Sequence, residues 1–535
     1  MNRSNINLLD LPYEILFIIL KKLDNMDVLY SLLDVDNQRL DIILQENTFT
    51  NNLKFVLTTL TDDISSIVDP ILNRFCINIL PKIHYNVKSL ILDSISMEKI
   101  LLAGDYPNLT QLKLFNFNGK IVSRYFTDKS PFRYIFQEQI TDLILVFEKN
   151  FNAISNKFYI TNLYGYVFNL FVNLKHFSIF ELFPYRFPCL KFRQLPLTIC
   201  FSSTLYKLSL YIQNLQDCYA LLDGRLKELT TLIVHIVQPD YLEYYSLNIN
   251  NMNDLPNLKC FSLTALSYCS SDTYDHMILP LFRRMLNLEE LTLSIFIQDR
   301  PFIDGTSLYN EILVYMPRLN MFNFRICTEK LINDSIHHLS KDDIQRTFTN
   351  TIFQQVECIV NYFYYIAQFH VFSLSFVFNY FNFIGNTFPT IIFNYVRILR
   401  VQDNVPFEHE FFIRIAWSFP LLQQLTVNNI RPQSLFSDEL NSNDNQLYSI
   451  VNYPYLISLC LENVHNDYAE QFLNDTKTHL PRLTKLIINY DQLQLVTENF
   501  TRERTRLNCA NVNELNLMMQ TIVHSKDFYV YFPLL

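Results

Sequence analysis

A pattern of apolar residues, L-x-x-L-x-L, recurs along the chain between residues 87 and 512. Pro or Asn often precedes it, as at Pro107-Asn108 and Pro256-Asn257. The clearest copies begin at Leu109, Leu258, Leu288, Leu319, Leu422, Leu456 and Leu483, and weaker ones begin at Val87, Ile140, Leu174, Leu205, Leu229, Phe369, Val396 and Val512. Neighbouring copies start 22 to 50 residues apart, with a mean spacing near 30. Self-similarity at such a period predicts a repeat array built from one supersecondary unit.

This pattern resembles that of leucine-rich repeats, although the Asn or Cys usual three positions after L-x-L is mostly missing. The resemblance implies an α/β solenoid with a parallel sheet on one face and helices on the other. The register is irregular. The 50-residue step from Leu319 to Phe369 either hides a unit or holds an insertion, and we expect a helix from Asp342 to Val360 within it.

Glycine is scarce: the chain has six among 535 residues, and the closest two are 15 positions apart. Phosphate-binding loops and the G-x-S-x-G nucleophile elbow need glycines within a few residues of each other, so these enzyme classes are excluded. Long repeat units whose turns use Pro, Asn and Asp agree with this composition. Aromatic residues, 15% of the chain, are expected to fill the space between strand and helix layers.

Charge and cysteine usage argue against nucleic acid, metal and redox functions. The 43 basic and 52 acidic residues give a net charge of −9 without a basic cluster, so no nucleic-acid partner is expected. The ten cysteines include no C-x-x-C pair, which predicts buried free thiols in a reducing compartment. We expect no metal and no cofactor.

The first fifty residues predict three helices. Pro12 and Glu14 suit a first helical turn, and Ile15-Leu16-Phe17-Ile18-Ile19-Leu20 follows without a polar residue. Further helical stretches cover residues 26–35 and begin again near Gln38. A surface helix of a globular protein buries only a stripe, so the surplus apolar face of the first helix is predicted to meet another chain.

This segment resembles an F-box, the three-helix module that docks substrate receptors on the Skp-type linker of cullin-RING ubiquitin ligases. The matching residues are Leu8 or Leu9, Leu11, Pro12, Glu14, Ile15, Ile19, Leu23, Asp27, Leu29, Val35 and Arg39. The resemblance implies that the linker binds Leu11, Pro12, Ile15, Ile19 and Leu23. The chain departs from the family at residues 36–40, where Asp-Asn-Gln-Arg-Leu replaces a Cys-Arg-x-Trp pattern, so the family's contact through the third helix is not carried over to this chain. An ordinary helical cap on the repeats is the alternative.

We therefore expect an F-box at residues 5–48, a helical connector at 49–81 and an irregular leucine-rich-repeat solenoid at 82–535. Strand alternation directs the residues between and after the L-x-L leucines to the open face of the sheet. This row is the candidate target-binding surface: Lys113, Phe115, His176, Phe180, Lys207, Tyr211, His235, Arg325, Arg400 and Gln402, with Gln424, Asn428 and Glu462 beyond them. Its mixed chemistry favours a protein partner. For any single residue, an ordinary solvated position is the alternative.

Catalytic and membrane signals are weak. His337-His338, Glu408-His409-Glu410 and His465-Asn466-Asp467 lack metal-ligand spacing, although residues distant in sequence can still converge in a fold. The uncharged stretch 358–396 is interrupted by Asn, Gln, His and Ser and is expected to be the core of a soluble fold. The N-terminus lacks a signal-peptide pattern, which predicts a cytoplasmic protein, with a nuclear location also open.

The leading hypothesis is a non-catalytic substrate receptor of a Skp/cullin/F-box ubiquitin ligase. Its partners would be the linker subunit, a cullin held through that linker, and an unidentified target protein, with no nucleic acid and no membrane. The second hypothesis is a protein-interaction scaffold that works without a ligase and carries a helical cap. Exposure of the apolar face from Ile15 to Leu23 distinguishes the two. A third, an enzyme with an unrecognised site, would need a deep pocket with converging His, Asp or Cys.

Overall fold

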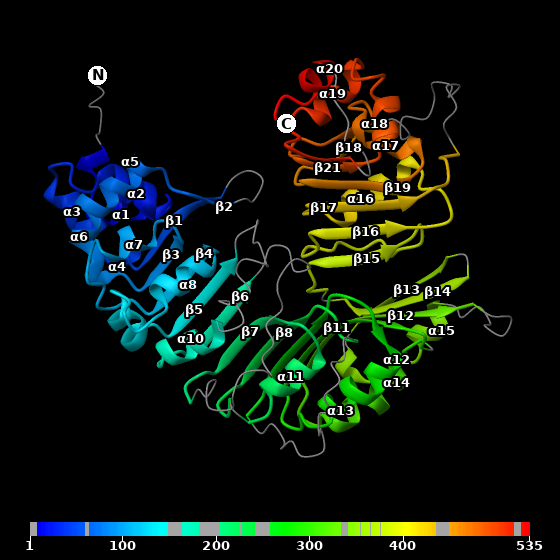
Figure 1. Cartoon of the computed structure of the whole chain (residues 1–535), viewed down its shortest axis with the longest axis horizontal. Helices are drawn as coiled ribbons and strands as arrows, with labels where there is room; N and C mark the ends of the chain where they lie inside the picture. The colour runs from blue at the N-terminus through cyan, green and yellow to red at the C-terminus, as the bar shows by residue number, and fades with distance from the viewer. Residues whose placement is uncertain are drawn as a thin grey trace. The chain divides into compact units, whose positions relative to one another are not determined.

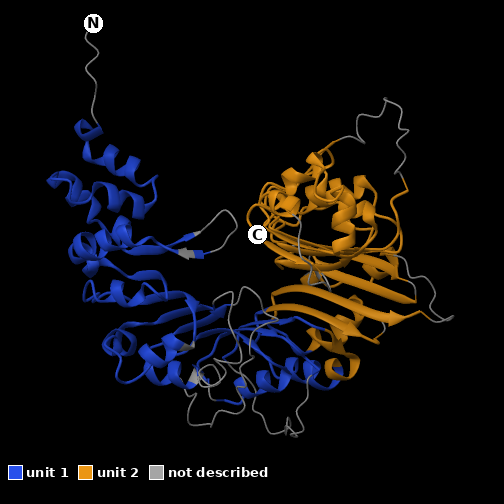
Figure 2. Cartoon of the chain, turned by 45° about the horizontal axis from the view of Figure 1, so that its top comes forward, with its two compact units in different colours: residues 1–267, 275–290, 315–318 blue, residues 268–274, 291–314, 319–535 orange. Residues whose placement is uncertain are grey.

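The computed structural model describes residues 8–58, 64–147, 163–180, 203–224, 226–240, 257–300, 302–332, 341–353, 355–363, 365–374, 376–434, 449–517 and 526–535. The chain forms two compact units (Figure 2): residues 1–267, 275–290 and 315–318 belong to the first, and residues 268–274, 291–314 and 319–535 to the second. Both are α/β with mostly parallel strands, so the predicted fold class is confirmed at that level. The sequence predicted one continuous array where the structure has two units.

The first unit begins with short helices: η1 (Leu8–Asp10), α1 (Tyr13–Leu20), α2 (Asn25–Leu32), α3 (Gln38–Leu44) and α4 (Asn47–Thr50). Side chains cap two of them. The Asp24 carboxylate accepts hydrogen bonds from the Met26 and Asp27 N–H groups at the start of α2, and the Asn37 side chain accepts one from Leu40 N–H at the start of α3. Caps of this kind satisfy backbone donors that have no partner within the helix.

In the described part of the first unit, nine strands pair in the order β2-β1-β3-β4-β5-β6-β7-β8-β9 (Figure 1). Apart from the antiparallel pair β1–β2, each neighbouring pair is parallel. The strands are β1 (Asn52–Thr58), β2 (Ile64–Ser66), β3 (Ser89–Asp93), β4 (Gln111–Phe117), β5 (Asp142–Phe147), β6 (His176–Phe180), β7 (Lys207–Ile212), β8 (Thr231–Ile236) and β9 (Cys260–Ala265).

The apolar repeat sets the register of this sheet. Leu90 of β3 lies opposite Leu112 of β4, which lies opposite Leu143 of β5, and all three side chains are buried. A shift of one residue would turn every leucine to the open face, so the buried face fixes the pairing. Of the fifteen predicted copies, only the one at Phe369 falls on a strand paired antiparallel to both neighbours.

The asparagine that often precedes a copy links successive repeats. Nδ2 of Asn108 donates to the Tyr85 carbonyl at 2.6 Å, and Asn173 and Asn257 bond the Glu138 and Lys227 carbonyls at 3.0 and 2.8 Å. Each acceptor belongs to the preceding repeat. The side chains thus satisfy turn carbonyls that the parallel sheet leaves unpaired.

Short helices return the chain between strands. In the first unit they are α5 (Asp69–Arg74), η2 (Phe75–Ile79), α6 (Leu80–Ile83), η3 (His84–Asn86), α7 (Met97–Leu101), α8 (Gly119–Tyr125), η4 (Ile135–Gln139), α10 (Leu163–Leu170), α11 (Leu215–Leu221) and α13 (Leu279–Phe282). The connector expected at 49–81 is only partly helical, because it also contains β1 and β2. Since β1 pairs with β3 and buries Leu53 and Phe55, it extends the repeat sheet toward the N-terminus.

The second unit contains a sheet in the order β11-β12-β14-β13, with β10 beside β11. Its elements are β10 (Cys269–Ser270), α12 (Ser271–Thr273), β11 (Glu290–Gln298), α14 (Gly305–Glu311), η9 (Leu313–Tyr315), β12 (Met321–Leu331), α15 (Lys341–Gln345), η10 (Thr351–Phe353), β13 (Val356–Phe363) and β14 (Ile366–Ser373), while η8 (Tyr274–Ile278) begins here and ends in the first unit. The helix expected from Asp342 to Val360 is wrong beyond Gln345, because Val356 already belongs to a β-hairpin.

A second, parallel sheet of this unit has the order β15-β16-β17-β19-β21-β22. Its strands are β15 (Tyr380–Ile384), β16 (Ile398–Gln402), β17 (Gln424–Asn429), β19 (Ser458–Val464), β21 (Lys485–Ile488) and β22 (Glu514–Leu517). The remaining elements are α16 (His409–Ser418), α17 (Asn466–Leu473), α18 (Tyr490–Val496), α19 (Glu503–Cys509), α20 (Lys526–Tyr531) and the short parallel pair β18 (Val451–Asn452) and β20 (Thr478–His479). The aromatic residues fill one core here, as expected.

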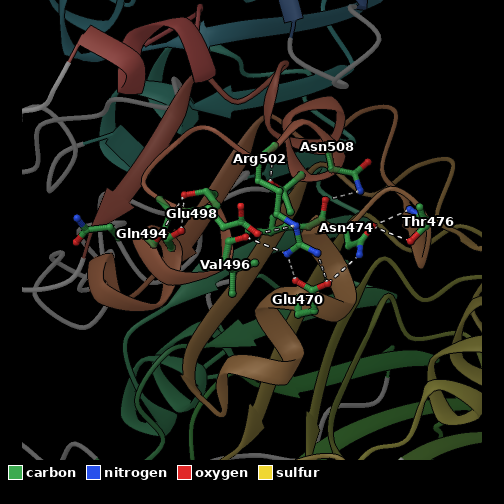
Figure 3. Close-up of polar contacts among 12 residues, drawn as sticks. Glu470, Asn474, Thr476, Gln494, Val496, Glu498, Arg502 and Asn508 are labelled. Atoms are coloured by element: carbon green, nitrogen blue, oxygen red, sulfur yellow. Dashed lines mark hydrogen bonds and ion pairs between the residues drawn. The ribbon is translucent and has the colours of Figure 1, made fainter. Parts of the chain in front are cut away.

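An ion pair connects α17 to the segment between α18 and α19 (Figure 3). The Arg502 guanidinium meets the Glu470 carboxylate at 2.5 and 3.0 Å and donates to the Val496 carbonyl at 3.1 Å. Nearby, Asn508 donates to the Phe472 and Leu473 carbonyls at the end of α17 and to the Thr478 carbonyl of β20. This network joins α17 to the chain around α18 and α19. None of the helices in the described ranges is long and apolar enough to cross a membrane.

Candidate docking surfaces

The first N-terminal helix, α1, has an apolar face that is exposed to solvent. Ile15, Ile18 and Ile19 of α1 are 45%, 55% and 38% exposed, and Leu23 just after the helix is 55% exposed. Leu16 and Leu20, on the opposite side of α1, are buried. Helix α1 therefore packs one apolar stripe into the protein core and leaves a second apolar stripe exposed to solvent, as its uninterrupted apolar run predicted.

Arg39 of α3 holds the segment before α1 in place. Its guanidinium donates to the Leu9 carbonyl at 2.9 Å and also to the Leu11 carbonyl. Leu8 and Leu9 are exposed and Leu11 is half-buried. The arginine thus fixes the backbone from which these leucines project.

The five residues predicted to bind a linker lie together. Ile15, Ile19 and Leu23 are exposed, Pro12 is exposed at the start of α1, and Leu11 is half-buried. Their role stays a prediction. Sequence reasoning missed Ile18 on the same helix, and Ile42 of α3, which is 65% exposed. The unbroken run Ile15–Leu20 could have indicated Ile18, but no sequence signal distinguished Ile42 from a core residue.

Several contacts join these helices to the first repeat. The Arg74 guanidinium lies over the Tyr30 ring, 5.0 Å from its centroid, and donates to the Leu33 carbonyl. Lys82 pairs with Asp34 at 2.5 Å. With Tyr30 on α2 and Arg74 on α5, the helices and the first repeat form one packed body.

The open face of the sheet in the first unit holds seven of the residues predicted to bind a target. His176, Phe180 and Lys207 are exposed, Lys113 and His235 are half-buried, and Phe115 and Tyr211 are buried. Aromatic contacts cause this burial. The Tyr211 and His235 rings stack with centroids 4.6 Å apart.

Two charged groups on this face are paired or stacked. His176 Nδ1 lies 2.6 Å from the Asp142 carboxylate on the neighbouring strand. The Lys113 ammonium lies 4.7 Å from the centroid of the Phe115 ring, and burial, together with the nearby Lys54, lowers the pKa of Lys113. Phe115 also packs with Val56 and Val146. The face thus offers apolar area with a few fixed polar groups, a composition typical of protein-binding surfaces.

In the second unit, Arg400 and Glu462 are exposed on the parallel sheet, and Gln402, Gln424 and Asn428 are half-buried. The predicted exposure of Arg325 on the target-binding face is wrong, because only 2% of its surface is exposed. Its alternation along β12 was predicted correctly, but β15 covers this position: the Arg325 guanidinium lies 4.5 Å from the Tyr380 ring centroid. Arg325 therefore belongs to the interior of this unit.

Polar clusters that could support chemistry are sparse. In the described ranges, no group of three or more His, Cys, Asp or Glu could hold a metal ion. His465 caps α17, accepting from Asp467 N–H at 3.4 Å, and His409 bonds Gln471 and Ser449. His337 and His338 lie outside the described residues. Eight cysteines in these ranges are free thiols, among them Cys218, Cys327 and Cys509, whose pKa is raised by burial.

No known protein family and no curated protein matches this sequence. Among solved structures, a chain of the yeast Rad7 and Elc1 complex is similar at 13% identity and a TM-score of 0.33. The match covers 81% of this chain and 87% of that one. At this TM-score the two chains do not superpose closely, and no function follows from the likeness.

Proposed function

We propose that this chain is the substrate-recognition subunit of a Skp/cullin/F-box type ubiquitin ligase in the cytoplasm or nucleus. The observation that carries the proposal is the open apolar stripe of α1, formed by Ile15, Ile18, Ile19 and Leu23 beside Leu11-Pro12. In an N-terminal cap these side chains would be buried on the repeats. An exposed stripe of this kind is instead suited to a helical partner with a complementary apolar groove.

The joined N-terminal helices and first repeat suit such a receptor. A linker bound to α1 would stand in a fixed orientation to the open face of the first sheet, because Arg74 and Lys82 tie α2 and the α2–α3 loop to α5 and α6. A target bound on that face would then meet ubiquitin carried by other subunits at high effective concentration. The chain itself would be a non-catalytic subunit and would carry out no step of ubiquitin transfer.

Co-expression with a Skp-type linker and purification through a tag on this chain tests the proposal. We expect the wild-type chain to retain the linker. Replacing Ile15 and Ile19 by Asp should weaken linker binding by about 100-fold or more, since a buried interface side chain contributes roughly 1–4 kcal/mol and each 1.4 kcal/mol is about tenfold.

Ile95→Asp is the matched control. Ile95 belongs to the same unit but not to the N-terminal helices, and it is 82% exposed. The control should retain the linker as the wild type does. A wild-type chain that never co-purifies with the linker would favour the second candidate, a scaffold that binds proteins without a ligase.

A further inference from the structure

The chain has one tryptophan, and it does not contribute to the core. Trp417 of α16 is 77% exposed and borders a cavity of about 360 Å³ in the second unit. Ile413, Ala416 and Pro420 line the same wall, and Ser449 to Asn452 line the other. The volume falls within the roughly 300–1,000 Å³ typical of ligand pockets.

The helical wall is a second apolar face of α16. Ile413, Ala416 and Trp417 follow the i, i+3, i+4 spacing that places residues on one side of a helix, and Pro420 follows just after its end. Phe411, Phe412 and Ile415 are buried in the core. Ile413 and Ala416 are half-buried and pack partly against that core, whereas Trp417 is exposed. The packing of α16 therefore uses only part of the cavity-lining face and does not need Trp417.

The opposite wall is a strand with one unpaired edge. Val451 N–H bonds the Lys477 carbonyl at 2.9 Å, and Tyr453 N–H bonds the His479 carbonyl at 3.2 Å, so both point toward β20. The intervening Asn452 must direct its N–H and C=O to the other side. In the described ranges, neither Ile450 nor Asn452 makes a backbone hydrogen bond on that side.

Polar contacts keep the two walls at a fixed spacing. His409 Nε2 lies 2.9 Å from the Ser449 carbonyl oxygen, and Tyr453 Oη donates to the Phe412 carbonyl at 3.0 Å. The first contact lies at the start of α16 and the second one turn further along. The groove is thus preformed, which reduces the ordering cost of binding.

We infer that this groove binds an extended peptide segment of a partner protein. The segment adds as a strand to the free edge of β18 and places a large apolar side chain beside Trp417. Unpaired backbone groups select an extended backbone, and the apolar wall selects the side chain. Tryptophan is enriched among residues that dominate binding energy. The inference does not depend on the ligase proposal.

Selection from a library of random ten-residue peptides displayed on phage, against the full chain, tests this site. Enriched peptides should carry a large apolar residue within an alternating, strand-type pattern. As synthetic peptides they should change the fluorescence of the chain, which reports on this groove because Trp417 is the sole tryptophan. Trp417→Ser should weaken their binding at least tenfold, as measured by fluorescence polarisation of labelled peptide.

Two further variants separate strand addition from simple adhesion to an apolar surface. Asn452→Pro removes an N–H that makes no backbone hydrogen bond in the described ranges, and proline is tolerated at the edge of a sheet. The fold should therefore persist while peptide binding falls at least tenfold. Tyr365→Ser, at a residue 76% exposed elsewhere in this unit, should leave binding unchanged. Circular dichroism checks that each variant is folded.

Three results would overturn the inference. They are a selection that enriches nothing over the Trp417→Ser variant, peptides that bind Asn452→Pro as tightly as the wild type, and a dimer of the chain that Trp417→Ser dissociates. The last would identify a second copy of the chain as the occupant of the groove.

Discussion

The burial of Arg325 depends on a strand that is distant in sequence and covers it. Its guanidinium donates to the Ser294 hydroxyl at 3.1 Å and stacks on Tyr380, yet its Nε has no hydrogen-bond partner and no carboxylate pairs with it in the described ranges. A buried cation of this kind contributes packing more than charge. Sequence alternation predicted its direction correctly, but the strand that covers it lies 55 residues further along the chain and left no sequence signal.

Arg325→Ala should lower the free energy of unfolding by about 2–4 kcal/mol, because it leaves a cavity beside Tyr380. Arg325→Met should stay within about 1 kcal/mol of the wild type, since it keeps the stem and removes the buried charge. Ser294 remains satisfied by the Tyr380 hydroxyl at 2.8 Å. Urea unfolding measures both. Equal losses in the two variants would show that the charge itself is stabilising.

His370 makes the stability of the second unit sensitive to acid. Burial, followed by the positive charge of Arg325, lowers the pKa of His370 to about 3. In the unfolded chain the imidazole titrates near 6.5. Below about pH 6.5 the unfolded state binds a proton on His370 that the folded state does not bind. The contribution of neutral His370 to the free energy of unfolding is therefore fully present above about pH 6.5 and is lost as the pH falls toward 3.

Between pH 7 and pH 5, His370 should therefore cost the folded state about 2 kcal/mol. Urea unfolding of the wild type and of His370→Gln at both pH values isolates this contribution. We expect a smaller loss in the variant. An identical pH dependence in the two proteins would mean that His370 is accessible to protons in the folded chain.

At the scale of elements, the parallel strands could be predicted and the hairpin could not. Inward leucines such as Leu112 and Leu143 belong to the same short apolar pattern in each repeat, so their burial fixes the strands and their register. In the hairpin, β14 is buried on both faces, from Ala367 through Ser373, and so lacks the alternation that separates strand from helix. Residues 346–360 were misassigned for a related reason, because apolar and polar positions there fit either period.

Helix α14 offers a test of close packing between elements. Gly305 begins this helix and donates to Thr347 Oγ1 at 2.9 Å. A Cβ at residue 305 would lie 2.6 Å from the Thr347 carbonyl carbon and 2.7 Å from Phe348 Cα, which are backbone atoms that cannot rotate away. Gly305→Ala should therefore destabilise the fold by about 1–3 kcal/mol, although alanine favours a helix.

Asn310→Ala, at an exposed position of the same helix, is the control. It should leave the urea midpoint unchanged or raise it slightly, because alanine has the higher helix propensity. A Gly305→Ala variant as stable as this control would show that the loop at Thr347 yields without cost.

At the scale of the whole molecule, the sequence indicated the α/β class and the position of the N-terminal helices. It did not reveal that the repeats divide into two units or that a β-hairpin precedes the second sheet. The apolar stripe of α1 was the more predictable candidate site, because an unbroken apolar run such as Ile15–Leu20 cannot be buried on one face. The groove beside Trp417 could not be predicted from the sequence, since it combines a helix with a strand more than 30 residues away.

Backbone hydrogen exchange of the full chain, with and without a purified Skp-type linker, tests the central claim most directly. If the linker binds the stripe of Ile15, Ile18, Ile19 and Leu23, exchange should slow in residues 13–20, and the repeats from β3 onward should exchange as before. The protection should vanish when Ile15 and Ile19 are replaced by Asp. Unchanged exchange across residues 13–20 at saturating linker, or protection confined to the repeats, would contradict the assignment of these helices as the docking module.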